Sequence, residues 1–142
     1  MSTLNNQKFY INGQWVNPNS VQLLDVINPA NEEIIAQITI GNEQDLNNAV
    51  KAAKISFESW SVSSIEKRLK LLNKLRDIYQ KRFDEMTVAI TTEMGCPRDF
   101  SSDVQTQSGL DHLNDFIEQL KNFNFENKFN EKSNNYITYE PI

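Results

Sequence analysis

The fold begins with the stretch Lys8-Phe9-Tyr10-Ile11-Asn12-Gly13-Gln14-Trp15-Val16. Two runs of strand-forming residues flank an Asn-Gly pair. This pair is typical of a type I′ turn, because both of its residues tolerate positive φ. The stretch therefore predicts a β-hairpin near the start of the chain.

Two more strands are predicted after this hairpin. The first covers Leu23–Ile27, and Asn28-Pro29-Ala30-Asn31 ends it. The second runs from Glu33 to Ile40, and its apolar residues recur at every second position. Side chains two residues apart lie on the same face of a strand, so we expect this face to be buried. The residues on it are Ile34, Ala36, Ile38 and Ile40.

Three amphipathic helices are predicted to follow. Asn42 can cap the first, which carries the apolar stripe Leu46, Val50, Ala53 and Phe57. Ser63 and Glu66 have the spacing of a capping box for the second helix, whose apolar pattern continues unbroken to Ile90. Gly95 and Pro97 are expected to end it. The third helix is predicted from Pro97 or Arg98 to about Asn122.

The remainder is a polar connection over residues 126–135 and a β-rich stretch that starts at Tyr136. No strand is expected nearby in the sequence to pair with this last stretch. A free β-rich edge is usually covered in natural domains. We therefore expect further chain or a partner subunit to pair with it.

Composition limits the classes of function. The chain has 142 residues, a net charge of −5 and one cysteine. This acidic balance disfavours nucleic acid and anionic membrane surfaces as partners. A single cysteine gives no internal disulfide, and no apolar run is long enough for a membrane span. The expectation is a protein of the cytoplasm.

The residues that could carry chemistry do not form a catalytic set. Cys96 follows a helix C-terminus, whose negative pole disfavours a thiolate, so we interpret it as structural. His112 stands alone and is interpreted as a partly buried structural histidine. The four glycines contain no Gly-x-Gly-x-x-Gly loop to hold a dinucleotide. The basic cluster on the second helix is interpreted as a solvated face: Lys67, Arg68, Lys70, Lys74 and Arg76.

Several segments, in this order, resemble the aldehyde dehydrogenase superfamily from about Lys8 to Ile142. They are Tyr10-Ile11-Asn12-Gly13-Gln14-Trp15-Val16, Val26-Ile27-Asn28-Pro29-Ala30-Asn31-Glu32-Glu33, Ala49-Val50-Lys51-Ala52-Ala53, Thr92-Glu93-Met94-Gly95-Cys96-Pro97 and Tyr139-Glu140-Pro141-Ile142.

The resemblance implies an activity for the whole enzyme. That enzyme oxidises an aldehyde to a carboxylate through a cysteine thiohemiacetal and passes the hydride to NAD or NADP. The nucleophile, the general base and the cofactor loop of the family all correspond to sequence beyond Ile142. No catalytic or cofactor-binding residue can therefore be assigned here, and Cys96 is not the family nucleophile. We expect no tight binding of NAD by this chain alone.

The resemblance also implies a monovalent cation site. Its ligands would be the backbone carbonyls of Val26 and Ile27 and the carboxylate of Glu93. Many relatives have Asp at the position of Glu93.

By resemblance, the fold is an incomplete aldehyde dehydrogenase-like α/β fold. Residues 1–7 would be a flexible N-terminus, and residues 8–125 the N-terminal part of the cofactor-binding domain, with strands over 8–40 and helices over 42–123. Residues 126–135 would connect to an oligomerisation strand over 136–142.

Two hypotheses for function follow. The first is an inactive N-terminal fragment that needs the rest of the enzyme or a neighbouring subunit, and that self-associates alone. The alternative is a non-catalytic interaction module that pairs through its helices and terminal strand.

Overall fold

The structure is a computed structural model that describes residues 7–132 and 134–140. Most of the predicted flexible N-terminus (residues 1–7) and the last two residues of the predicted terminal strand lie outside this description. β1 (Phe9–Ile11) and β2 (Gln14–Val16) form the predicted antiparallel hairpin. Asn12 and Gly13 both adopt positive φ, 52° and 76°, as the Asn-Gly pair predicts.

A second antiparallel pair consists of β3 (Leu23–Ile27) and β4 (Ile34–Thr39), with a register shift between Val26 and Ile27. The prediction of a buried face on β4 is wrong within this chain. Ile34, Ile38 and Ile40 are 61%, 37% and 36% exposed. The sequence alternates as expected, but no element among the described residues covers that face.

The first predicted helix is α1 (Glu43–Trp60), and Asn42 caps it as expected. Asn42 Oδ1 accepts from the Asp45 backbone N–H, and Asp45 Oδ2 accepts from the Asn42 backbone N–H at 3.0 Å. Asp45 also accepts from the backbone N–H and the side-chain amide of Asn19, at 2.9 and 2.8 Å. This buried carboxylate thus fastens the loop before β3 to the start of α1.

The pKa of Asp45 lies below its ordinary value of 3.8, first because the Asn19 backbone N–H donates to the carboxylate and then because that of Asn42 does. A lowered pKa means that the charged form is favoured in the folded state. The stabilising effect of this charge is therefore present above about pH 3.8 and is lost as the pH falls through the lower, folded-state value.

Replacing Asp45 with asparagine tests this linkage. We expect Asp45→Asn to lower the urea midpoint at pH 7, because an amide oxygen accepts these hydrogen bonds more weakly than a carboxylate. Below pH 3.8 the gap between the two midpoints should narrow, and it should close as the pH falls through the lowered folded-state pKa of Asp45, where the wild-type carboxyl group is neutral in both states. Circular dichroism in urea at both pH values measures the gap. An equal gap at both would contradict the linkage.

The predicted second helix is two helices, α2 (Ile65–Lys81) and α3 (Phe83–Met94), so the expectation of one unbroken helix is wrong. Arg82 leaves the helical region, with φ −105° and ψ 19°. The first turn of α3 contains Asp84 and Glu85, which favour a helix N-terminus. The predicted cap is also displaced by one residue. Ser64, rather than Ser63, accepts from the Lys67 backbone N–H at 3.2 Å.

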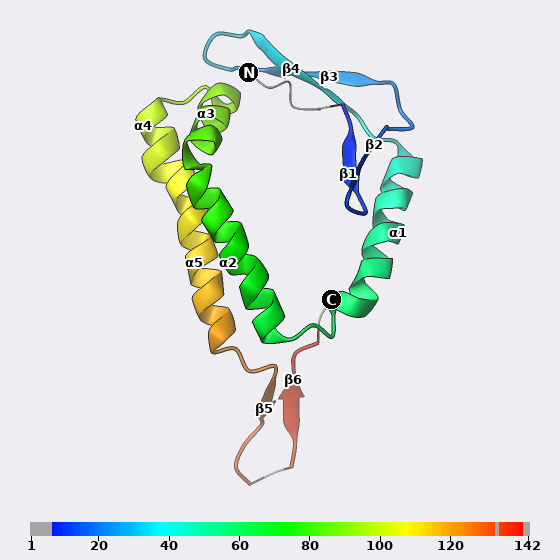
Figure 1. Cartoon of the computed structure of the whole chain (residues 1–142), viewed down its shortest axis with the longest axis vertical. Helices are drawn as coiled ribbons and strands as arrows, with labels where there is room; N and C mark the ends of the chain where they lie inside the picture. Colours follow the sequence, from blue (N-terminus) through cyan, green and yellow to red (C-terminus); the bar gives the residue numbers. More distant parts are fainter. Residues whose placement is uncertain (1–6, 133, 141–142) are drawn as a thin grey trace.

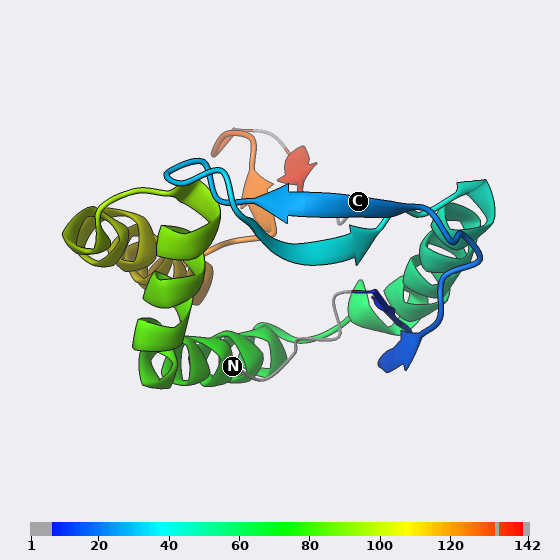
Figure 2. The ribbon, with the colours of Figure 1, turned by 90° about the horizontal axis from the view of Figure 1, so that it is seen from above.

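Gly95 ends α3 in the left-handed conformation, with φ 66°, as predicted. The third predicted helix then forms a rod of three parts: α4 (Arg98–Phe100), the π-helical segment η1 (Ser101–Thr106) and α5 (Gln107–Lys121). The rod lies beside α2, and the two form the longest helix pair of the molecule (Figures 1 and 2). The only apolar residue that is fully buried among the described residues, Ile117, is in α5.

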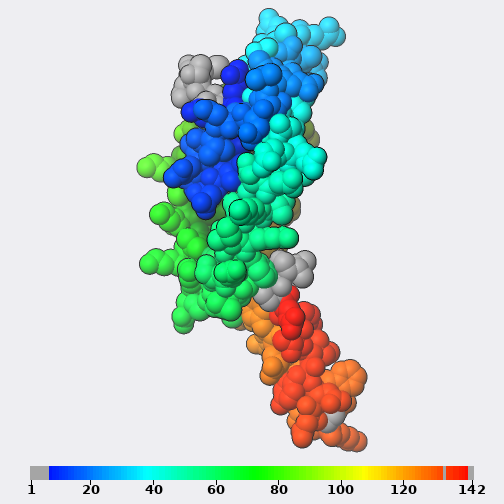
Figure 3. Space-filling model, turned by 90° about the vertical axis from the view of Figure 1, so that its right-hand side faces the viewer, coloured from blue at the N-terminus to red at the C-terminus, as the bar shows by residue number. Residues whose placement is uncertain are grey.

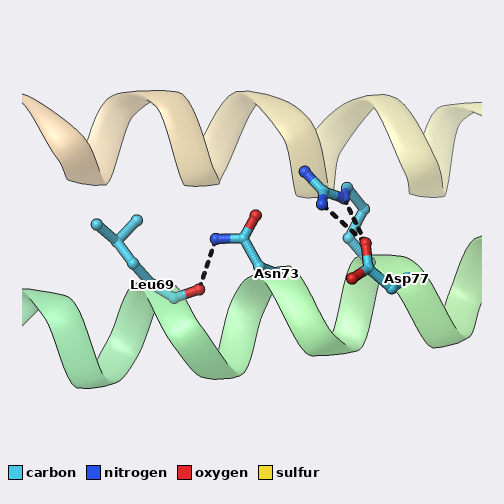
Figure 4. Close-up of polar contacts among 4 residues, drawn as sticks. Leu69, Asn73 and Asp77 are labelled. Carbon is cyan, nitrogen blue, oxygen red and sulfur yellow. Dashed lines mark hydrogen bonds and ion pairs between the residues drawn. The ribbon is translucent and has the colours of Figure 1, made fainter.

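Within this helix pair, α2 carries polar side chains whose contacts are shown in Figure 4. Asn73 Nδ2 donates to the Leu69 carbonyl of the preceding turn at 2.8 Å. Arg76 pairs with its neighbour Asp77 at 2.7 Å. These contacts satisfy polar groups within α2 itself, so the attachment of α5 rests on packing and on a few contacts further along the helix.

The interpretation of the basic cluster as a solvated face is wrong for Arg68. This side chain is half-buried between the rings of Trp60 and Phe125, which lie 5.4 and 5.7 Å from its guanidinium carbon. It also donates to the Trp60 and Ser61 carbonyls and to Ser63 Oγ. Arg68 therefore joins the α1–α2 turn to the segment after α5.

The last stretch has a strand partner, contrary to the expectation from the sequence. β5 (Glu126–Lys128) lies within the predicted polar connection and pairs antiparallel with β6 (Tyr136–Thr138). The resulting hairpin projects beyond the helices (Figure 3). Across the residues that the structure describes, no helix is both long and apolar enough to cross a membrane.

Candidate functional site

The candidate site is the junction between the β3–β4 turn and the end of α3. Asn28 organises the turn. Its backbone N–H donates to the Glu33 carbonyl at 2.9 Å, and its carbonyl accepts from the Glu32 N–H at 2.8 Å. Its side-chain oxygen accepts from the Ala30 N–H at 2.9 Å. Glu32 takes a positive φ of 60° to close the turn.

Gly95 brings the end of α3 against this turn. A Cβ atom at Gly95 would lie 2.7 Å from the Ala30 backbone nitrogen and 3.0 Å from Asn28 Oδ1. Only a residue without a side chain fits this approach. The contact joins two segments that are more than sixty residues apart in the sequence and that hold the predicted cation ligands.

The three predicted cation ligands flank this junction. Val26 is half-buried, whereas Ile27, the last residue of β3, is 52% exposed. Glu93 is exposed in the last turn of α3, two residues before Gly95. The structure brings their segments together, but it records no direct contact among the three residues. The cation site therefore stays a prediction.

The predicted ligands at this junction are all oxygen atoms. Carbonyl and carboxylate oxygens are hard ligands, and hard cations prefer them. The C-terminal end of α3 adds a partial negative charge. A site built from side chains alone is not present: within residues 7–132 and 134–140, no three His, Cys, Asp or Glu side chains gather as metal ligands.

Cys96 lies beside the junction and has a structural partner. Its Sγ is 2.9 Å from Ser101 Oγ, which itself donates to the Pro97 carbonyl at 3.2 Å. A hydroxyl whose proton is engaged elsewhere accepts from the thiol. The geometry thus supports a structural thiol and provides no base beside it. His112 is exposed on α5, so the expectation that it is partly buried is wrong.

A buried cluster of hydroxyl groups, which no sequence pattern indicates, joins α3 to the rod. Thr87 donates to Thr106 Oγ1 at 3.0 Å, and Thr106 Oγ1 donates to the Ser101 carbonyl at 2.8 Å. Tyr79 donates to the Thr106 carbonyl at 3.0 Å. The Thr106 carbonyl belongs to the π-helical segment, where the helical bonding pattern is interrupted. The cluster satisfies buried polar groups and positions α3.

Taken together, the described residues show no catalytic arrangement. Cys96 lies between α3 and α4, whereas His112 lies on α5, and the structure shows no contact between the two side chains. The four glycines are isolated from one another, and the strands that the structure describes form antiparallel pairs without a βαβ crossover.

Comparisons with known proteins agree with the resemblance in the sequence. The sequence model of the aldehyde dehydrogenase family matches residues 15–142. A protein of Staphylococcus epidermidis whose name assigns it to the aldehyde dehydrogenases is 44% identical over 119 residues, which are 84% of this chain and 25% of the relative. A Staphylococcus aureus protein with the same type of name is 40% identical, over 85% of this chain and 26% of its own length.

Solved structures of aldehyde dehydrogenases also match this chain over about a quarter of their own length. The aldehyde dehydrogenase of Bartonella henselae superposes with a TM-score of 0.88 at 39% identity, covering 92% of this chain and 28% of that one. An aldehyde dehydrogenase variant of Pseudomonas syringae, solved with NAD⁺ and octanal, gives 0.84 at 31% identity, covering 88% and 26%. The chain spans about a quarter of the length of the relatives that it matches, and it belongs to the aldehyde dehydrogenase family.

Proposed function

We propose that the chain is the N-terminal scaffold of an NAD(P)-dependent aldehyde dehydrogenase and is inactive alone. In the complete enzyme, a cysteine thiol would add to the aldehyde, the thiohemiacetal would be oxidised to a thioester with NAD or NADP as the hydride acceptor, and water would release the carboxylate and the free thiol. The observation that supports the scaffold role is the match to a quarter of each relative combined with an almost coreless structure. Helices and strands that leave their apolar faces open need the remaining three quarters of the fold.

Two features support inactivity of the chain alone. Its single thiol is held by Ser101 and lacks a neighbouring base. A thiol without a base or a positive environment is a weak nucleophile. In addition, no Gly-rich turn at a helix N-terminus is available to receive a pyrophosphate within the described residues.

Binding and turnover measurements test this proposal directly. We expect calorimetric titration of the purified chain with NAD⁺ to give no heat of binding, and octanal with NAD⁺ to give no absorbance increase at 340 nm. A fusion of this chain to the remaining three quarters of the S. epidermidis relative should bind NAD⁺ and turn over an aldehyde. Turnover by the isolated chain, or a folded fusion that binds no NAD⁺, would refute the proposal.

The junction of Asn28 and Gly95 is proposed to hold a monovalent cation in the complete enzyme. Val26 and Ile27 would supply carbonyl oxygens and Glu93 a carboxylate oxygen. Two observations support this assignment: the β3–β4 turn packs closely against Gly95, and the C-terminal end of α3 carries a partial negative charge. The cation would stabilise the junction and takes no part in the chemical step.

The hairpin of β5 and β6 is proposed to contact a neighbouring subunit. Its side chains are open to solvent, with Tyr136 56% and Ile137 45% exposed. Each of its two strands also has a free edge in the three-residue ladder, and free strand edges pair readily with other chains. The same exposed surfaces support self-association of the isolated chain.

A further inference from the structure

The β5–β6 hairpin makes few contacts with the rest of the described chain. Its strands pair over three residues each, and the main packing of each strand is against the other. The hairpin projects beyond the helices (Figures 1 and 3), and Phe129, directly after β5, is 63% exposed. The direction of the hairpin therefore depends on the residues at its base.

Three aromatic residues form the base of the hairpin. Phe123 and Phe125 precede β5, and Tyr139 follows β6. The Tyr139 backbone N–H donates to the Phe125 carbonyl at 2.8 Å, which continues the strand pairing. The Phe123 ring contacts the other two edge to face, with centroids 4.8 Å from Phe125 and 5.5 Å from Tyr139. The strands and their base are therefore joined into one unit.

The covalent connection to the helices does not fix the direction of this unit. Residues 122–125 lead from the end of α5 to β5 without helix or strand structure, and only Phe125 among them is partly buried. Rotations about the backbone of an irregular, exposed segment change the direction of everything beyond it. A contact between the base and the helices is needed to hold the hairpin in one direction.

Arg68 of α2 provides this contact. Its guanidinium carbon lies 5.7 Å from the centre of the Phe125 ring and 5.4 Å from that of the Trp60 ring. Its Nη2 donates to the Trp60 and Ser61 carbonyls at 3.2 and 3.0 Å, and its Nε donates to Ser63 Oγ at 2.9 Å. These hydrogen bonds fix the plane of the guanidinium, so the Phe125 ring contacts a cation that is held in place.

We propose that Arg68 is a positioning residue: it sets the direction of the β5–β6 hairpin and thereby the affinity between subunits of the complete enzyme. The part about subunits rests on the proposed function, in which the hairpin contacts a neighbouring subunit. An element that is held in one direction before association loses less conformational freedom on binding. Removal of the Arg68 side chain therefore weakens assembly although no residue of the hairpin itself changes.

Distances between two spin labels on the chain test the positioning. Nitroxides are attached through Lys74→Cys in α2 and Glu131→Cys in the turn of the hairpin, in a Cys96→Ser background, and labelled chains are diluted into unlabelled ones. We expect Arg68→Gln to broaden the distance distribution at least about twofold, because the hairpin then changes direction about residues 122–125. Lys70→Gln, which removes the same charge from an exposed position of α2, should leave the width unchanged. An unchanged width in Arg68→Gln would overturn the proposal.

A second variant separates positioning of the hairpin from local support of the α1–α2 turn. Phe125→Leu removes the ring that the guanidinium contacts and leaves the hydrogen bonds of Arg68 to Trp60, Ser61 and Ser63 in place. If Arg68 acts through Phe125, Arg68→Gln broadens the distances little further in the Phe125→Leu background. Additive broadening by the two substitutions would show that Arg68 supports the turn alone, and would overturn the proposal.

The covalent fusion described above tests the consequence for assembly. We expect Arg68→Gln to raise the dissociation constant between subunits about tenfold or more, as measured by light scattering over a dilution series. NAD⁺ binding by each chain and the assembly of the Lys70→Gln fusion should be unchanged. Equal assembly of the parent and Arg68→Gln fusions would overturn the inference alone. A parent fusion that stays monomeric would overturn the proposed subunit contact together with the assembly part of the inference.

Discussion

Replacing Gly95 with alanine should lower the free energy of unfolding by about 3 kcal/mol, from left-handed strain and a backbone clash together. The φ of 66° already disfavours any residue with a side chain. The new Cβ would also meet the Ala30 backbone nitrogen at 2.7 Å. Backbone of a closed turn cannot swing aside, so the β3–β4 turn would separate from α3. Urea unfolding followed by circular dichroism measures the change.

Gly13 provides the matched control for this substitution. It has a similar φ of 76°, but a Cβ there meets nothing within 4 Å. Gly13→Ala should therefore cost only the left-handed strain, about 1 kcal/mol. The difference between the two losses of unfolding free energy measures the contribution of the close contact between the β3–β4 turn and the end of α3. If both variants lost the same stability, the contact at Ala30 would be energetically irrelevant and the candidate site would lose its structural basis.

The elements that the sequence predicts correctly depend on contacts between near neighbours. The Asn12-Gly13 turn, the Asn42 cap and the Gly95 helix end each follow from the conformational range or hydrogen-bonding groups of a few adjacent residues. The segment order of the aldehyde dehydrogenase family could also be recognised, because each of its turns and helix ends leaves a short local pattern. Local chemistry is visible in sequence without knowledge of the fold.

The wrong predictions concern features that hydrophobic periodicity and residue spacing do not encode. Arg68 has the spacing of a surface residue, and only the folded chain reveals the rings of Trp60 and Phe125 on either side of it. The pairing of β5 with β6 joins a polar run to an apolar one, so hydrophobic alternation did not indicate it. The bend at Arg82 contains neither glycine nor proline. The acidic pair Asp84 and Glu85 was the one available signal for it.

For the candidate site too, some features could be predicted from the sequence and others are visible only in the structure. The resemblance indicated Val26, Ile27 and Glu93, and the structure adds the reason why their segments meet, which is the missing side chain at Gly95. The hydroxyl cluster of Thr87 and Thr106 could not be anticipated, because single threonines in helices carry no periodic signal. The predicted buried face of β4 is open in the structure, because hydrophobic periodicity does not indicate which segment supplies the cover.

The second large effect is expected at Gly109, in α5, where Gly109→Ala should destabilise the chain by about 2 kcal/mol. Alanine in a helix is ordinarily more stable than glycine by up to about 1 kcal/mol, so the expected sign is reversed. The reason is Tyr79 on α2: a Cβ at Gly109 would overlap its hydroxyl and lie 2.9 Å from its Cζ. The ring would have to move, which breaks the hydrogen bond from Tyr79 to the Thr106 carbonyl.

A double-mutant cycle with Tyr79→Phe separates these contributions. Phenylalanine lacks the hydroxyl, so the hydrogen bond and the closest overlap are absent in that background. The cost of Gly109→Ala should then fall by about 1 kcal/mol or more, which is the coupling expected of residues in contact. Urea unfolding of the four proteins gives the coupling. If Gly109→Ala costs the same in both backgrounds, the overlap with Tyr79 is not the cause, and α5 packs on α2 less closely than the structure places it.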